Sequence, residues 1–119
     1  MSHLALAIYE ALRGVVQARQ PHISYSGLVS RLGPMPVPNE DLQARDPRLD
    51  EALGELVTAC RNLGLPAISA LVVRDKERVP GPGYYTIAHP DEAHDKERAI
   101  VAWGREAERA RIEPYPERL

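Results

Sequence analysis

The residues that could act as catalysts are few and isolated. The single cysteine, Cys60, falls in a helical stripe of apolar residues, a setting that raises the pKa of a thiol and makes it unreactive. The four histidines, His3, His22, His89 and His94, form no HExxH motif, and a single cysteine cannot complete a zinc site with them. We therefore expect a buried core thiol, no metal and no cofactor.

Residues 91–94 spell DEAH, a string known from helicases. A helicase also needs a glycine-rich phosphate-binding loop that ends in Lys-Ser or Lys-Thr, and the sequence has no such loop. We interpret the string as chance, with Asp91 and Glu92 serving as the acidic first turn of a helix. Because no pair of nucleophile and base is recognisable, enzymatic activity is not expected.

A charged turn provides the first candidate binding surface. Residues 74–78 read Arg-Asp-Lys-Glu-Arg, and at the tip of a hairpin such a turn is either solvated or in contact with a phosphate backbone. Residues 1–37 add three arginines against the single Glu10, which makes this part of the chain slightly basic. The DNA-binding candidates are Arg31, Arg74, Lys76 and Arg78.

An acidic segment provides the second candidate surface. Residues 38–52 hold five carboxylates against two arginines, and phosphates would repel a helix that entered a DNA groove behind this segment. An acidic surface is better suited to a basic patch on a partner protein. The protein-binding candidates are Glu40, Asp41, Asp50 and Glu51.

Length and composition restrict the class of protein. The chain has 119 residues, 44% of them hydrophobic and 27% charged, with a net charge of −2 at pH 7. These values predict one folded domain over residues 1–119 and exclude a two-domain enzyme. The charge balance lacks the global positive field of an obvious nucleic-acid binder, so any DNA contact must be local. One cysteine and no long apolar stretch favour a cytoplasmic protein without a membrane partner.

The spacing of apolar residues and prolines predicts four helices that would position these side chains. The first begins after Ser2 and stops before Pro21, and the second runs from its cap Ser24 to Gly33. A long proline-rich loop over 34–47 follows. The third helix starts with Asp46 as cap and ends at Gly64, and the last covers 91–112, docked by Trp103.

Two apolar, strand-like segments flank the charged turn. Residues 68–73 and 84–87 are rich in β-branched or aromatic side chains, which predicts a β-hairpin. The order helix, short helix, helix, hairpin is typical of an α+β fold of winged helix-turn-helix type, here with an N-terminal helix, a β-hairpin wing and an extra C-terminal helix. Other small α+β domains share this order.

Three strings resemble the DNA-binding domain of alkylguanine DNA alkyltransferases and alkyltransferase-like proteins. They are ISYSGLVSRLG from Ile23, EALGELVTACRNLGLP from Glu51, and ISALVV from Ile68 followed by PGPGYY. The resemblance covers about residues 22–86 and implies a winged-helix core that binds DNA. The end of the second string, together with the third, also resembles small bacterial and phage proteins with a Gly-Leu-Pro, apolar strand and Pro-Gly-x-Gly-aromatic pattern.

At two positions the sequence lacks a residue on which the activity of that family depends. Aligning the paired valines places Ser69 at the nucleophilic cysteine, and a serine without a neighbouring base cannot replace a thiolate. Glu51 falls where the family has the arginine that holds the duplex open after base flipping. We therefore expect a non-catalytic module that binds duplex DNA weakly or non-specifically through its wing. The alternative is a protein-binding module, such as a phage or mobile-element inhibitor or adaptor of a nucleic-acid-processing complex, that uses residues 39–51.

Overall fold

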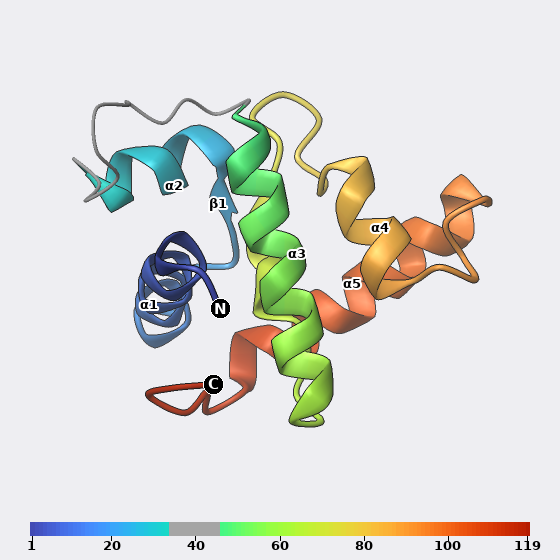
Figure 1. Cartoon of the computed structure of the whole chain (residues 1–119). Helices are drawn as coiled ribbons and strands as arrows, with labels where there is room; N and C mark the ends of the chain where they lie inside the picture. The colour runs from blue at the N-terminus through green and yellow to red at the C-terminus, as the bar shows by residue number, and fades with distance from the viewer. Residues whose placement is uncertain (34–45) are drawn as a thin grey trace.

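A computed structural model describes residues 1–33 and 46–119, in which helices surround one small sheet (Figure 1). In chain order the elements are α1 (His3–Gln17), β1 (Ile23–Ser24), α2 (Tyr25–Leu32), α3 (Pro47–Asn62), the 3-10 helix η1 (Ile68–Leu71), β2 (Val72–Val73), α4 (Pro82–Ala88) and α5 (Lys96–Ile112). The chain is thus a mostly helical α+β domain. None of the described helices is long and apolar enough to cross a membrane.

Three helices begin at the capping residues that the sequence predicts. Each cap accepts a hydrogen bond from a backbone N–H two or three residues later, at 3.1 Å for Ser2, 3.0 Å for Ser24 and 2.9 Å for Asp46. These bonds satisfy N–H groups that have no partner within the helix. Gly33 and Gly64 follow the ends of α2 and α3 with φ of +63° and +70°, values that side chains with a Cβ disfavour.

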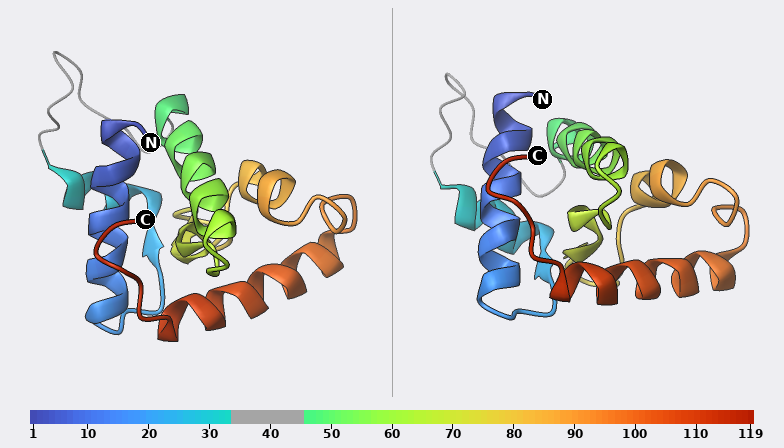
Figure 2. Two further views of the ribbon diagram at one scale, coloured as in Figure 1. Left: turned by 60° about the horizontal axis from the view of Figure 1, so that its bottom comes forward. Right: turned by 90° about the horizontal axis from the view of Figure 1, so that it is seen from below.

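The core lies between α1, α3 and η1, and α5 crosses one side of them (Figure 2). Ile8, Leu12, Leu56 and Leu71 are fully buried there. The predicted docking of Trp103 is confirmed, because its indole N–H donates to the carbonyl of Ala70 at 2.8 Å. After α5 the chain turns back along α1, where Tyr115 packs edge-on against Tyr9 with ring centroids 6.4 Å apart.

The predicted β-hairpin wing is wrong. β2 pairs with β1 in parallel, in the register Ile23 with Val72, and parallel strands need a long crossover, here supplied by α2 and α3. Only residues 72 and 73 of the predicted strand 68–73 are extended, and residues 84–87 belong to α4. A helix forms there because Pro82 suits its first turn and because Tyr84 and Ala88, four residues apart, are both buried.

The last helix also starts later than predicted. α5 begins at Lys96, and residues 91–94 lie in a turn. The cap is Asp95, whose carboxylate accepts hydrogen bonds from the backbone N–H groups of Glu97 and Arg98 at 3.0 Å and 3.2 Å. The helix starts where an acidic side chain can satisfy its first N–H groups, so Asp91 and Glu92 do not form its first turn.

Candidate nucleic-acid interface

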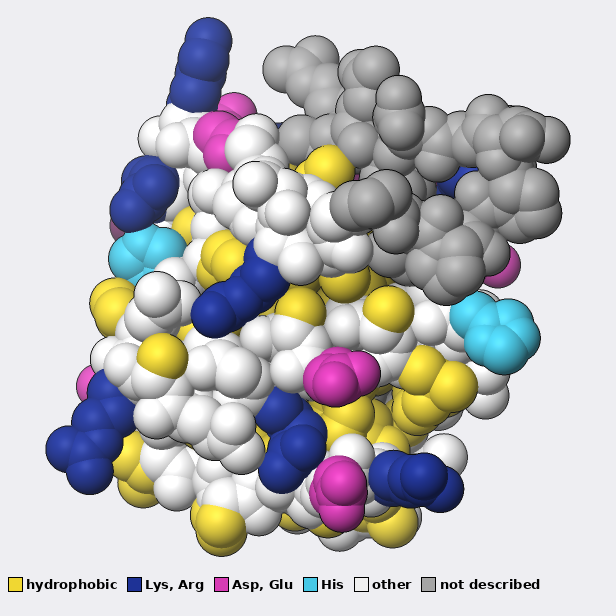
Figure 3. Space-filling view, turned by 90° about the vertical axis from the view of Figure 1, so that its left-hand side faces the viewer, with side chains coloured by type: hydrophobic (Ala, Val, Ile, Leu, Met, Phe, Trp, Pro, Cys, Tyr) yellow, Lys and Arg dark blue, Asp and Glu magenta, His cyan; other side chains and the backbone are white. Residues whose placement is uncertain are grey.

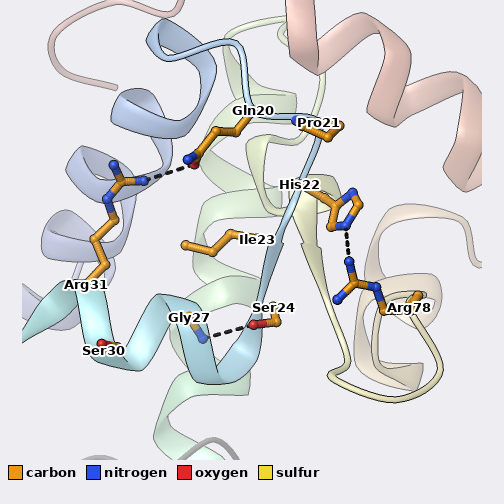
Figure 4. Close-up of a pocket in the computed structure, with 9 residues that line it drawn as sticks. All are labelled: Gln20, Pro21, His22, Ile23, Ser24, Gly27, Ser30, Arg31 and Arg78. Atoms are coloured by element: carbon orange, nitrogen blue, oxygen red, sulfur yellow. Dashed lines mark hydrogen bonds between the residues drawn. The ribbon is translucent and has the colours of Figure 1, made fainter.

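A shallow, open hollow of about 510 Å³ lies between α2, β1 and the turn that follows β2 (Figure 4). We call it the basic hollow. Its lining residues are Gln20, Pro21, His22, Ile23, Ser24, Gly27, Ser30, Arg31 and Arg78. Two of them are arginines and none is acidic, so the local field attracts anions.

The parallel pairing of β1 and β2 positions the turn that carries Arg78. The turn is closed by hydrogen bonds from the N–H of Arg74 to the carbonyl of Val79 at 2.8 Å and from the N–H of Arg78 to the carbonyl of Arg74 at 3.0 Å. Asp75 fastens it to the start of α2 by accepting from the hydroxyl of Ser26 at 2.8 Å. Arg78 has a φ of +60°, which is unfavourable for a non-glycine residue, so the turn holds it in a strained position.

Both arginines of the basic hollow have neutral hydrogen-bond partners. Arg31 donates to the amide oxygen of Gln20 at 3.4 Å, and Arg78 lies 2.8 Å from Nε2 of His22. A guanidinium can only donate, so this imidazole nitrogen accepts and carries no proton. Figure 4 shows the two pairs on opposite sides of β1. Within the described residues neither arginine is paired with a carboxylate at ion-pair distance. The pKa of the nearby Asp75 carboxylate is lowered most by its hydrogen bond with a serine hydroxyl, and the charge of Arg78 contributes to this shift.

The surroundings of His22 are positively charged. Burial lowers the pKa of its imidazole, and the charges of Arg78 and Arg111 lower it further. Arg111 is held beside this site because its Nε donates to the carbonyl of Pro21 at 2.8 Å. Figure 3 shows that basic and acidic side chains are interspersed on the side of the molecule that lies at the left in Figure 1.

The other two DNA-binding candidates lie elsewhere. Arg74 and Lys76 line a groove of about 550 Å³ together with three carboxylates, those of Asp50, Asp75 and Glu77. Arg74 also approaches Glu77 in an ion pair at 4.0 Å. We call this the mixed groove. The structure thus places Arg31 and Arg78 in the lining of one hollow, on opposite sides of β1, and places Arg74 and Lys76 beside carboxylates, where attraction for phosphate is weaker.

Of the four protein-binding candidates, only two lie within the described residues. Asp50 and Glu51 are exposed near the start of α3, whereas Glu40 and Asp41 lie outside the described residues. Asp50 lines the mixed groove next to Tyr25, and burial and the Asp50 charge raise the pKa of the Tyr25 phenol to about 12. This groove is therefore acidic at the α3 side.

A small pocket of about 20 Å³ adjoins the mixed groove and contains the residue aligned with the family's cysteine. Ser69 is buried, and within the described chain its hydroxyl has no hydrogen-bond partner. No base therefore contacts it. The volume suffices for about one water molecule. The lining residues that come from the strings of the resemblance are Tyr25, Leu53, Gly54, Val57, Ser69, Val72, Gly83 and Tyr84.

One buried acid was not found by sequence reasoning. Glu106 is 3% exposed and accepts hydrogen bonds from the backbone N–H of Ala67 at 3.1 Å and from the phenol of Tyr84. It also forms an ion pair with the Arg61 guanidinium at 2.7 Å and lies 3.1 Å from Nε2 of His89, a nitrogen that is 3.0 Å from the Tyr84 phenol. It ties α3, α4 and α5 together. The sequence held one signal for this role, because Glu106 lies three and four residues from the buried side of α5 at Trp103 and Ala110.

The expected core thiol is confirmed. Cys60 is free and buried on α3, and burial raises the pKa of its thiol. Over residues 1–33 and 46–119, no group of three potential metal ligands comes together. The comparisons of the chain with protein-family models, with curated proteins and with solved structures find no match.

Proposed function

We propose that this chain is a non-catalytic module that binds the phosphate backbone of duplex DNA through the basic hollow. The observation that carries the proposal is that Arg31 and Arg78, 47 positions apart in sequence, line one open hollow whose described lining residues include no carboxylate. Lysine and arginine contacts to phosphates provide affinity without reading the base sequence. The expected binding is therefore weak and largely non-specific.

The local arrangement fits a chain with a net charge of −2. A protein without a global positive field can bind a polyanion only where cations gather and carboxylates are absent. The strained φ of Arg78 supports a binding role, since such strain is concentrated at functional positions. The turn over 74–79 would contact the backbone in place of the predicted wing.

The resemblance to alkyltransferase-like domains adds support of a different kind. Strings that are far apart in the sequence contribute to one small pocket around Ser69, the residue aligned with the cysteine of that family. The serine has no partner that could activate it. The proposal therefore takes from that family the binding of DNA and leaves out the transfer of an alkyl group.

A salt titration of duplex binding tests the proposal. The observed association constant should fall linearly on a log–log plot against salt, and the double variant Arg31→Ala/Arg78→Ala should reduce the slope by about 2, since each lost phosphate contact removes roughly 0.9. The matched control is Lys96→Ala/Arg98→Ala, which removes the same charge from the exposed start of α5. A wild-type chain without affinity for duplex at low salt would refute the proposal.

A second function is favoured by the mixed groove, whose carboxylates outnumber its cations three to two. We propose as the alternative that Asp50 and Glu51 contact a basic patch on a partner protein. Charge reversal of both residues should then abolish copurification of one specific partner while the circular dichroism spectrum stays unchanged. Capture of that partner by the reversed variant would exclude this surface.

A further inference from the structure

His22 is the one side chain of the basic hollow whose charge changes near neutral pH. Its neutral state follows from geometry, because Nε2 accepts a hydrogen bond from Arg78 at 2.8 Å. The imidazole is half-buried at the edge of the hollow, beside β1. A ligand in the hollow would therefore contact a group that can gain a positive charge.

The charged groups around His22 are mainly cations. Arg78 faces it from the turn after β2, Arg111 from α5, and Arg31 lies across β1. The carboxylate of the same turn, Asp75, accepts from Ser26 and is not among the lining residues. In the free protein these cations oppose protonation of the imidazole.

A phosphate in the basic hollow reverses this balance. Its negative charge offsets the positive charges of the arginines. In the free protein Arg78 donates a hydrogen bond to His22, and in the complex the phosphate oxygens accept that hydrogen bond instead. Released from Arg78, Nε2 can bind a proton from solvent and donate to the phosphate as well. The imidazolium would then add a third positive charge to the lining of the hollow, beside those of Arg31 and Arg78.

We propose that His22 takes up one proton when a DNA phosphate occupies the basic hollow, so that binding strengthens as the pH falls. This inference rests on the proposed function and adds its regulation. The sign follows from linkage, because a group with a higher pKa in the complex than in the free protein favours the complex at low pH. The affinity is constant at a pH above the pKa that His22 has in the complex, and below that pKa it rises by at most about tenfold per pH unit. It levels off at a pH below the pKa that His22 has in the free protein.

The test is the affinity for a short labelled duplex between about pH 5.5 and about pH 8 at constant ionic strength, a range that spans the titration of histidine. The wild type should bind several-fold more tightly at the acidic end. His22→Gln, which cannot be protonated, should bind with the weaker affinity at every pH. His22→Arg, which is always charged, should bind tightly at every pH. His94→Gln, a variant at an exposed histidine, is the control and should follow the wild type.

The outcomes separate this inference from the proposed function. If His22→Gln keeps the pH dependence of the wild type, the proton binds elsewhere and the inference is wrong, while DNA binding stands. A wild-type affinity that does not change with pH also shows that the inference is wrong, and it too leaves DNA binding standing. If the wild type binds no duplex at any pH in low salt, both are wrong. Circular dichroism at each pH shows whether the variants are folded.

Discussion

Replacing Glu106 with alanine should destabilise the protein more than any other single change to a charged side chain on α5. The substitution removes the acceptor of the backbone N–H of Ala67, a residue that is 0% exposed, and one of the two partners of the Tyr84 phenol, which also lies 3.0 Å from Nε2 of His89. Each buried donor left without an acceptor costs about 1 to 3 kcal/mol. The side chain of Arg61 is 40% exposed and can be hydrated again, so its lost ion pair adds little.

The expected cost is about 2 to 4 kcal/mol, of which about 1 to 3 kcal/mol comes from the unpaired N–H of Ala67 and about 1 kcal/mol from the lost hydrogen bond of Tyr84. That is a large part of the roughly 5 to 15 kcal/mol that stabilises a small domain. Glu106→Gln keeps the shape and one acceptor oxygen, so its cost should be smaller, about 1 to 3 kcal/mol. The control Glu108→Ala lies on the exposed side of the same helix and should change the free energy of unfolding by about 0.5 kcal/mol or less.

Urea denaturation followed by far-ultraviolet circular dichroism measures these free energies of unfolding for all three variants. The loss of unfolding free energy should be largest for Glu106→Ala, smaller for Glu106→Gln and smallest for Glu108→Ala. This order is itself a test, because the loss depends on how many buried donors keep an acceptor. If Glu106→Ala costs less than about 1 kcal/mol, the buried donors find other partners, and Glu106 does not tie α3, α4 and α5 together.

Three further predictions concern α2 and α3. Ser24→Ala removes the cap of α2 and should lower the free energy of unfolding by about 1 kcal/mol, measured by urea denaturation; an unchanged midpoint would contradict the cap. Cys60 should react with Ellman's reagent only after unfolding, because it is buried and its thiol pKa is raised; rapid reaction of the native protein would contradict its burial. Hydrogen bonds from Arg48 hold the pKa of Asp46 at about 2. The stabilisation by this carboxylate should be complete above about pH 4 and lost as the pH falls through about 2. Asp46→Asn should therefore show a weaker decline of the urea midpoint over this range, and a decline equal to that of the wild type would contradict it.

The helices with local start signals could be predicted from the sequence. Ser2, Ser24 and Asp46 each cap a helix through a bond to an amide two or three residues away, so the information lies within one turn of chain. The wing could not be predicted correctly. Pro82 is a local signal for the start of a helix, but the burial of Tyr84 and Ala88 on one side of it depends on partners far along the chain, here Glu106 for Tyr84.

The candidate site was partly predictable for the same reason. Arg31 and Arg78 could be named as phosphate contacts from their charge, but their sharing of one hollow depends on the parallel pairing of β1 and β2. The contact between Arg78 and His22 spans 56 positions and leaves no local pattern. The burial of Glu106 has only the weak signal of its position on the apolar side of α5.

Chemical-shift mapping by NMR tests most directly whether the basic hollow is the binding surface. A short duplex is added to the isotope-labelled chain at low salt, and the backbone amide signals are followed. The proposed function predicts that the largest shifts fall on residues 20–31 and 74–79, and that they disappear in Arg31→Ala/Arg78→Ala. Shifts concentrated at Asp50 and Glu51, with the hollow unaffected, would contradict it.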